Sequence, residues 1–323
     1  MLAVTCTSQS MDDPLAGLTL GEVAEPTVPP GWVRVHVRAA SLNHHDLWSL
    51  KGVGLAADRL PMTLGCDAAG VTDDGTEVVV HALVGDPDWA GDETLDPRRT
   101  ILSELHQGAL AAQVVVPRRN VVPKPASLSF EEAACLPTAW LTAYRMLFTQ
   151  AGLKPGDRVL IQGAGGGVAT AAVALARAAG YVVWATSRDP QRGERALALG
   201  AHAVFPTGAR LPARVDAVIE TVGEATWAHS MRALRPGGTL VVSGATTGAQ
   251  PPADLNRLFF LQLRVIGSTM GTRRELEQLL SLCEATGTRP LIDEVLPLER
   301  AHDAFARLAT GDVFGKLVLR VGG

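Results

Sequence analysis

Two hydrophobic patterns divide the chain. Residues 33–37 alternate apolar and polar side chains, which predicts a strand with one buried face. Similar runs follow at residues 77–84 and 111–116, separated by Gly, Pro and Asp, and helical periodicity is missing before Ser129. We therefore predict a mainly β domain over residues 1–122.

A capping motif marks the change to helical structure. Ser129 and Glu132 have the spacing of a capping box, which predicts a helix that Pro137 interrupts and a second helical run over residues 138–149. Short apolar runs then alternate with helical segments. The predicted strands are residues 159–162, 182–186, 203–205, 215–219, 239–243 and 264–267.

Strands joined by helices predict a parallel sheet, because parallel neighbours need a crossover that covers one sheet face. Residues 123–290 are therefore predicted to form a doubly wound, Rossmann-type α/β domain. The tail over residues 291–321 has a strand, helix, strand pattern and is expected to return to the first domain.

Composition narrows the choice of partners. The 323 residues carry a net charge of −4, so no basic field favours nucleic acid or anionic lipid. The amino terminus lacks the pattern of a secretory signal, and the longest apolar run, residues 168–179, is too short for a bilayer and contains Arg177. We expect a cytoplasmic protein that acts on a small molecule, with neither nucleic acid nor a membrane as partner.

A glycine-rich loop follows the first strand of the predicted parallel sheet. Strand, glycines and helix in this order bring backbone N–H groups and a helix N-terminus to one point, where a pyrophosphate can bind. The alternative is a glycine-rich turn that only packs helix on strand. The predicted phosphate contacts are Ala164, Gly165, Gly166, Gly167 and Val168.

The end of the second strand favours NADPH over NADH. An enzyme for NAD usually has an acid there, about 20 residues after the loop, to bind the ribose 2′-hydroxyl. This strand ends in Ser187 and Arg188, which can donate to a 2′-phosphate, and Arg192 is a possible second cation. The alternative is that Arg188 is a solvated loop residue.

Four segments together resemble the medium-chain dehydrogenase/reductase superfamily, and within it the zinc-independent quinone oxidoreductase and enoyl reductase branch. They are residues 40–48, 65–70, 163–180 and 315–319. The resemblance implies a GroES-like catalytic domain over residues 1–122, completed by residues 291–323. It also implies a homodimer made through the nucleotide domains.

Departures from the zinc-dependent members predict that no metal is bound. The places of their catalytic ligands hold Asn43, Cys66 and a stretch around Thr138, and one sulfur cannot replace a tetrahedral donor set. The chain has only four scattered cysteines, and none lies in residues 82–103, where a structural zinc lobe would fall. An improvised site is the alternative, with Cys66, Asp67, His44 and His45 as ligands.

The resemblance also assigns contacts to the cofactor. Lys316 matches a basic residue that reaches the pyrophosphate. Ser243 to Ala245 and Gly267 to Thr269 fall at strand ends that flank the nicotinamide. The predicted contacts there are Gly244, Ala245, Ser268 and Thr269. Asp46 and Asp67 are expected to hold the catalytic turn by hydrogen bonds.

These features predict hydride transfer from NADPH to a quinone or an α,β-unsaturated carbonyl. Without a metal, only hydrogen-bond donors can stabilise the oxyanion that develops on the acceptor. The candidates are Asn43, His44, His45 and Thr138. Two alternatives stay open, a zinc-dependent alcohol dehydrogenase or aldehyde reductase and an NADPH-binding protein without turnover.

Overall fold

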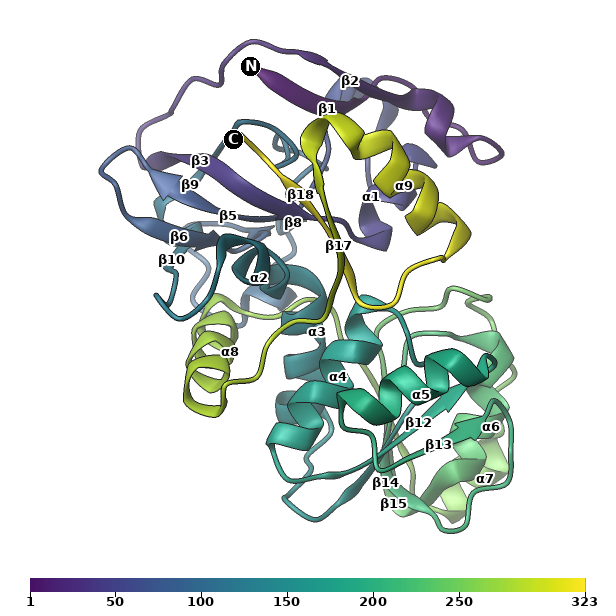
Figure 1. The fold of residues 1–323 in the computed structure, drawn as a ribbon. Helices are drawn as coiled ribbons and strands as arrows, with labels where there is room; N and C mark the ends of the chain where they lie inside the picture. Colours follow the sequence, from purple (N-terminus) through teal and green to yellow (C-terminus); the bar gives the residue numbers. More distant parts are fainter. Residues whose placement is uncertain (323) are drawn as a thin grey trace. The chain divides into compact units, whose positions relative to one another are not determined.

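The computed structural model describes residues 1–322 and divides them into two compact units (Figure 1). Unit 1 comprises residues 1–139 and 271–322, and unit 2 comprises residues 140–270. These limits differ from the predicted ones at 122/123 and 290/291. Helix α2 (Phe130–Ala134) packs against strands of unit 1, and α8 (Arg273–Thr286) contacts β10 of the same unit.

A seven-stranded sheet forms the centre of unit 1, in the order β10-β6-β5-β3-β18-β17 with β9 paired to β3. Its strands are β3 (Trp32–Ser41), β5 (Asp67–Thr72), β6 (Glu77–Val80), β9 (Gln113–Pro117), β10 (Val121–Pro123), β17 (Ile292–Pro297) and β18 (Lys316–Arg320). Two smaller sheets join β1 (Leu2–Cys6), β2 (Leu18–Glu22) and β4 (Met62–Thr63), and β7 (Leu83–Val84) with β8 (Thr100–Ile101). The predicted β character of this region is confirmed.

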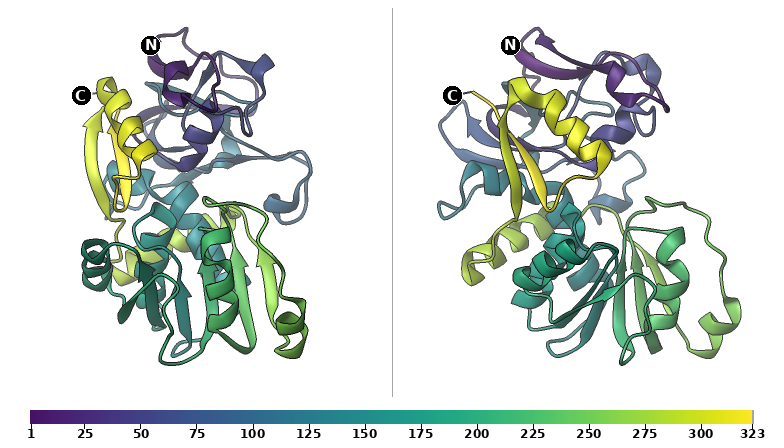
Figure 2. Two further views of the ribbon diagram at one scale, coloured as in Figure 1. Left: turned by 90° about the vertical axis from the view of Figure 1, so that its right-hand side faces the viewer. Right: turned by 45° about the vertical axis from the view of Figure 1, so that its right-hand side comes forward.

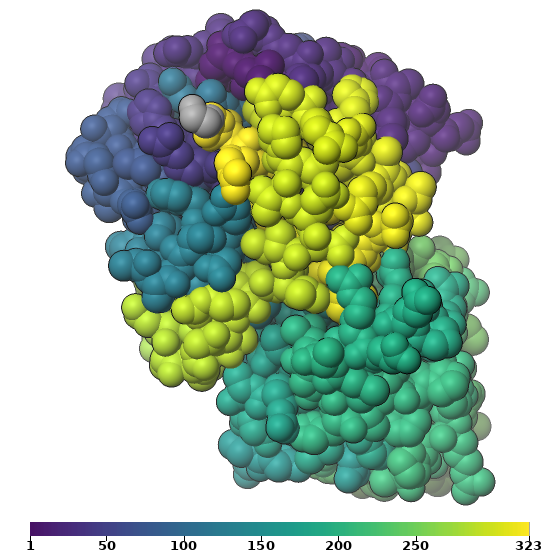
Figure 3. Space-filling view, viewed as in Figure 1, coloured from purple at the N-terminus to yellow at the C-terminus, as the bar shows by residue number. Residues whose placement is uncertain are grey.

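The tail returns to the first domain as predicted. β18 pairs antiparallel with β3, so that Val318 lies opposite Ser41. Between β17 and β18, α9 (Ala301–Thr310) packs against α1 (His44–Leu50), and the space-filling view shows the tail beside the amino-terminal segment (Figure 3). This pairing brings the start of β18 next to the end of β3.

The helix α1 was missed by the sequence analysis. Its seven residues are too few to show a hydrophobic period. By contrast, the helix predicted to begin at Ser129 is confirmed, since the hydroxyl of Ser129 accepts the N–H of Glu132 at 3.1 Å. The helical run beyond it consists of π-helical turns at Leu136–Trp140 and Arg145–Gln150 with α3 (Leu141–Tyr144) between them.

Unit 2 is a doubly wound parallel sheet, as predicted, with the order β13-β12-β11-β14-β15-β16. Its strands are β11 (Arg158–Ile161), β12 (Val182–Ser187), β13 (Ala203–Pro206), β14 (Val215–Glu220), β15 (Leu234–Val242) and β16 (Arg264–Gly267). Helices lie on both faces of this sheet (Figure 2), namely α4 (Gly167–Ala178), α5 (Pro190–Leu199), α6 (Glu224–Ala233) and α7 (Leu255–Phe260). The chain order reverses between β11 and β14, where sheets of this type bind ligands.

None of the helices within residues 1–322 has the length and apolar character needed to span a bilayer.

Candidate active site

The amino end of α1 is tied to the turn before β5. Asp46 is fully buried, and its carboxylate accepts the N–H of Asn43 at 2.8 Å and the N–H of Gly65 at 3.1 Å. Asp67 accepts from the hydroxyl of Ser41 at 2.9 Å. The expectation that Asp46 and Asp67 hold this turn by hydrogen bonds is confirmed.

The side chain of Asn43 is saturated by the protein. Its Nδ2 donates to Asp67 Oδ2 at 2.8 Å and lies 3.5 Å from Cys66 Sγ, and its Oδ1 accepts from Lys316 Nζ at 2.6 Å. The residue is only 7% exposed. Asn43 therefore has no free donor for a substrate, and its predicted role as a direct donor needs correction to one of positioning.

Lys316 lies elsewhere than predicted. Its ammonium is enclosed in unit 1, where it donates to the carbonyl of Leu42 and to Asn43, each at 2.6 Å, and lies 3.5 Å from Asp67 Oδ2. These acceptors use the protons of the ammonium. The prediction that Lys316 reaches a pyrophosphate does not fit this geometry, because the pairing of β18 with β3 directs the side chain into unit 1.

The adjacent histidines differ. His44 is exposed and has no hydrogen-bond partner among residues 1–322. Its pKa is lowered, mainly because the ring is partly desolvated and also because Lys316 and Lys51 carry positive charge nearby. His45 Nε2 lies 3.1 Å from Glu104 Oε1. Burial would lower the pKa of His45, but the nearby Cys66 and Glu104 raise it to about 11. Only His44 is a neutral, unoccupied donor.

Thr138 and Cys66 meet beside Asn43. Thr138 is half-buried on the first π-helical turn, and its hydroxyl lies 3.4 Å from Cys66 Sγ. Burial and the neighbouring Asp67 raise the pKa of the Cys66 thiol. Unit 1 thus brings together all four predicted catalytic candidates, and of these His44 is the exposed one that has no hydrogen-bond partner among the described residues.

The glycine-rich loop of unit 2 leads into α4. Gly165 has a φ of +141°, a conformation that favours glycine, and no side chain caps the N-terminus of α4. Its first N–H groups suit an anion. Ala164 is a correction, because its N–H already donates to the carbonyl of Thr186 at 2.7 Å. The predicted contacts at Gly165, Gly166, Gly167 and Val168 remain proposals.

The end of β12 bears on the choice of nucleotide. Arg188 is exposed and has no ion-pair partner among the described residues. The hydroxyl of Ser187 donates to the carbonyl of Asp189 at 2.7 Å, so its proton is not free for a phosphate. Asp189, which the sequence analysis overlooked, caps α5 by accepting the N–H of Gln191 at 2.8 Å, and Arg192 Nε lies 3.9 Å from its carboxylate.

The ends of β15 and β16 offer fewer groups than predicted. The hydroxyl of Ser268 is buried without a hydrogen-bond partner in the part of the chain that the structure describes. Thr269 and Ala245 are exposed. A Cβ on Gly244 would lie 2.9 Å from the carbonyl oxygen of Thr221, so packing accounts for that glycine. Ser268 is the strongest candidate contact here.

Comparison with known proteins identifies the family. The profile of the alcohol dehydrogenase GroES-like domain matches residues 29–126, and that of the zinc-binding dehydrogenase matches residues 167–285. The chain is 31% identical to an alcohol dehydrogenase of Geobacillus stearothermophilus, across 94% of this chain and 96% of that protein. The chain belongs to the medium-chain dehydrogenase/reductase superfamily. The predicted GroES-like and Rossmann architecture is confirmed.

Solved structures of this superfamily resemble the chain closely. A structure described as an NAD-dependent alcohol dehydrogenase has a TM-score of 0.93 and 34% identity, covering 100% of both chains. The crotonyl-CoA carboxylase/reductase AntE in complex with NADP has a TM-score of 0.91 and 25% identity, covering 99% of this chain and 94% of that one. The names of these neighbours differ in cofactor and substrate. They therefore identify neither the cofactor nor the substrate of this medium-chain dehydrogenase/reductase.

Zinc, which many members of the superfamily bind, does not fit the donors of this one. His45, Asp46 and Cys66 offer ligand atoms within 4.8 Å of one another. Both oxygens of Asp46 already accept N–H groups, and Nε2 of His45 is bound to Glu104. Nδ1 of His45 and the sulfur of Cys66 remain, which fall short of the four donors of a tetrahedral site.

Residues 82–103, where zinc-dependent members have a structural zinc lobe, contain no cysteine and are stabilised by hydrogen bonds. Asp96 accepts the N–H of Asp86 at 2.6 Å, and Asp92 accepts the N–H of Thr94 at 2.9 Å. Carboxylate to backbone hydrogen bonds of this kind stabilise turns. They fold the loop locally.

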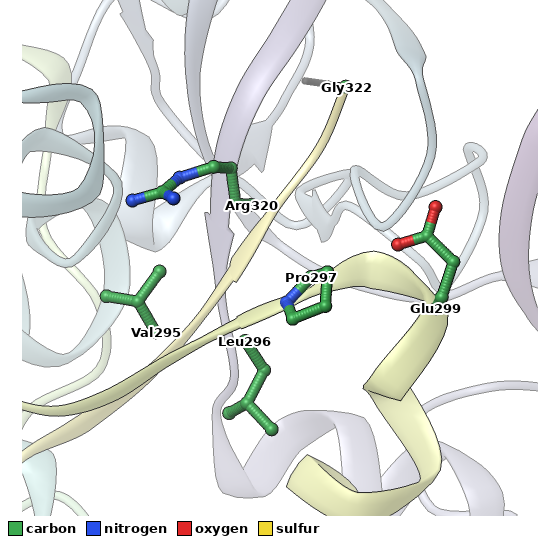
Figure 4. A pocket seen from close by; sticks show the side chains of 6 residues that line it. All are labelled: Val295, Leu296, Pro297, Glu299, Arg320 and Gly322. Atoms are coloured by element: carbon green, nitrogen blue, oxygen red, sulfur yellow. The ribbon is translucent and has the colours of Figure 1, made fainter.

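A surface hollow of unit 1 has no link to these groups (Figure 4). Arg320 at its rim pairs with Glu131 at 2.8 Å, and no predicted site residue lines it. The other lining residues are Val295, Leu296, Pro297, Glu299 and Gly322.

Proposed function

We propose that this protein reduces a quinone or an α,β-unsaturated carbonyl with NADPH and without a metal. One observation carries the proposal: the ammonium of Lys316 lies 3.5 Å from Asp67 and is bound to Asn43, among the groups where zinc-dependent relatives would need anionic donors. A fixed cation at this point disfavours a divalent ion. A bound metal would act as the Lewis acid that makes the alkoxide for alcohol oxidation, whereas reduction of a neutral acceptor needs only stabilisation of the developing oxyanion.

The nucleotide is assigned to unit 2. The uncapped N-terminus of α4 and the loop before it fit a pyrophosphate, and the exposed, unpaired Arg188 fits a 2′-phosphate. The NADP complex of AntE supports the choice of cofactor. Bound NADPH would supply the hydride. Ser268 offers a hydroxyl to the ligand. Arg192 stays in the proposal as a second cation, although Asp189 lies 3.9 Å from its Nε and offsets part of its charge.

The acceptor is assigned to unit 1. His44 is neutral near pH 7 because its pKa is lowered, and an N–H of its ring can donate to the developing oxyanion. Asn43 and Lys316 hold the start of α1, so that His44 presents its ring from a rigid helix. Thr138 packs against Cys66 and supports the same cluster.

A metal-dependent alcohol dehydrogenase is the second candidate, favoured by the group His45, Asp46 and Cys66 and by the alcohol dehydrogenases among the relatives. The test is NADPH oxidation against a panel of quinones, enones and aldehydes, with NADP reduction by primary alcohols measured alongside. Turnover of an enone or quinone in the presence of a chelator supports the proposal. Alcohol oxidation that a chelator abolishes would replace it, and NADPH binding without any turnover would indicate a non-catalytic protein.

We also propose a homodimer formed through β16. This strand is at the edge of the unit 2 sheet, and Arg264, Val265 and Gly267 are exposed along it. An unpaired strand edge can pair antiparallel with its own copy about a two-fold axis. Nearby on α7, Phe260 is 76% exposed. Light scattering should give the mass of a dimer.

The variant Val265→Pro should lower that mass toward a monomer, because proline removes a ladder N–H from the edge. The control is Leu197→Ser, which changes an exposed leucine of α5. A monomeric wild type, or a dimer that Val265→Pro leaves intact, would contradict this interface.

A further inference from the structure

A buried carboxylate of unit 2 has no part in the predicted site. Glu220 ends β14 and is fully enclosed. Its carboxylate accepts the N–H groups of Val222 at 2.8 Å and Gly223 at 3.1 Å, and the hydroxyl of Ser230 at 2.6 Å. The hydroxyl of Thr226 donates to both oxygens, at 2.9 and 2.8 Å. Every one of these partners is a donor, so Glu220 serves purely as an acceptor.

A chain of hydrogen bonds runs from Glu220 to the glycine-rich loop. Ser230 gives its proton to Glu220 and therefore accepts from Gln162 Nε2, at 2.9 Å. The amide then presents Oε1 to Thr186, whose hydroxyl donates to it at 2.7 Å. Because this proton is used, Thr186 Oγ1 accepts the N–H of Gly163 at 3.1 Å. Because the Glu220 carboxylate can only accept, it determines which atom donates in each hydrogen bond from Ser230 to the N–H of Gly163.

A histidine fixes the same amide from another side. Nε2 of Gln162 lies 2.9 Å from Nδ1 of His229, and Nε2 of His229 lies 2.9 Å from the carbonyl of Ala209. A carbonyl can only accept, so His229 is the tautomer with the proton on Nε2, and its Nδ1 accepts from Gln162. Burial lowers the pKa of His229, which keeps the ring in this neutral form.

The conformation of the glycine-rich loop depends on these hydrogen bonds. Gly163 has a φ of +75°, and a Cβ there would lie 2.9 Å from a methyl carbon of Val222. Thr186 binds both the N–H of Gly163, through its hydroxyl, and the N–H of Ala164, through its carbonyl. The first two N–H groups of the loop are therefore bound to β12. The phosphate is left to the N–H groups of residues 165–168.

We propose that Glu220 is a positioning residue for the nucleotide phosphate. It acts through Ser230, Gln162 and Thr186 to set the conformation of the loop, without touching the nucleotide. Each of these side chains is fully buried, so a change at one is passed to the next and cannot be relieved by water. The inference rests on the proposed nucleotide binding of unit 2.

The test compares Thr186→Val with Thr186→Ser, using NADPH as the probe. Valine keeps the shape but leaves the N–H of Gly163 unpaired, and serine restores the hydroxyl. We expect Thr186→Val to raise the Kd for NADPH about tenfold, and Thr186→Ser to stay within about twofold of wild type. The KM for NADPH should follow the Kd, while kcat with the best acceptor changes less.

A matched control separates positioning from general destabilisation. Thr239 is another buried threonine of the same sheet, and its hydroxyl accepts from Arg264 at 2.8 Å with no link to the loop. Thr239→Val should lower the melting temperature but leave the Kd for NADPH unchanged. An equal loss of affinity in Thr239→Val and Thr186→Val would overturn the proposal.

The variant Glu220→Gln tests the other end of the hydrogen-bond network. Its amide N–H₂ group would face the N–H and hydroxyl donors that now bind the Glu220 carboxylate. Residues linked in one network have non-additive effects, so Glu220→Gln with Thr186→Val should weaken NADPH binding no more than about twofold beyond the worse single variant. Losses that multiply would show that Glu220 does not act through Thr186. If Glu220→Gln fails to fold, the Thr186 and Thr239 variants decide. A wild type that binds neither NADPH nor NADH would refute the proposed function itself, and this inference with it.

Discussion

Replacing Lys316 with methionine tests whether this lysine forms a buried ion pair in unit 1. The change keeps most of the side-chain volume but removes an ammonium that is 3% exposed. It leaves Asn43 Oδ1 without its donor at 2.6 Å and the fully buried Asp67 without the cation 3.5 Å away. Removing one partner of a buried charged pair costs about 3 to 5 kcal/mol, because the remaining charge stays buried without compensation.

The assay is urea unfolding at pH 7.5, followed by circular dichroism. We expect Lys316→Met to lower the free energy of unfolding by about 3 to 5 kcal/mol. The double variant Lys316→Met with Asp67→Asn should recover part of this loss, because it removes the stranded charge as well. The Kd for NADPH of Lys316→Met should remain near the wild-type value.

Two results would contradict the buried position of Lys316. If the free energy of unfolding fell by less than about 1 kcal/mol, the ion pair of Lys316 with Asp67 would be as weak as a pair on the protein surface. If the Kd for NADPH rose about tenfold or more in folded Lys316→Met, Lys316 would instead be a direct contact of the pyrophosphate, since a charge-assisted hydrogen bond contributes about 1.5 to 3 kcal/mol.

Four further predictions concern the 2′-phosphate, the oxyanion, the metal content and the effect of pH. Arg188→Ala should weaken NADPH binding about tenfold and leave NADH binding unchanged in fluorescence titrations, and equal losses for both would refute the 2′-phosphate contact. His44→Ala should lower kcat for quinone or enone reduction about 100-fold at constant Kd for NADPH, and full activity would exclude His44 as the oxyanion donor. Protein purified without added metal should contain far less than one zinc per chain by elemental analysis, and stoichiometric zinc would show that the cluster holds enough donors after all. Burial lowers the pKa of four histidines, His44, His81, His106 and His229, so below about pH 6.5 they take up protons more readily in the unfolded chain than in the native state. His45, with its pKa raised to about 11, is a single group that acts in the opposite direction. The free energy of unfolding should therefore fall between pH 7.5 and pH 5.5, and a rise in urea experiments would contradict this.

Local patterns in the sequence were sufficient for the architecture. The six strands of unit 2, the helix at Ser129 and the strand, helix, strand tail were all predicted, because each depends on a hydrophobic period or a capping motif within a few residues. The glycine-rich loop was found in the same way. The helix α1 was missed because its seven residues are too short for a period, although Asn43 followed by Asp46 was a usable signal.

The roles of individual polar groups depended on contacts that no local pattern encodes. Lys316 and Asn43 are 273 residues apart in sequence and share a hydrogen bond because β18 pairs with β3. The N–H of Ala164 and the proton of Ser187 looked free but are used by neighbouring backbone. Glu220 gave no signal at all, since its importance lies in donors from α6 and from the loop between β14 and α6. A hydrophobic period is a property of one segment, so the sequence was enough to predict most of the helices and strands. A buried polar group needs a partner that can come from any part of the fold, so the groups that remain free for chemistry depend on tertiary contacts.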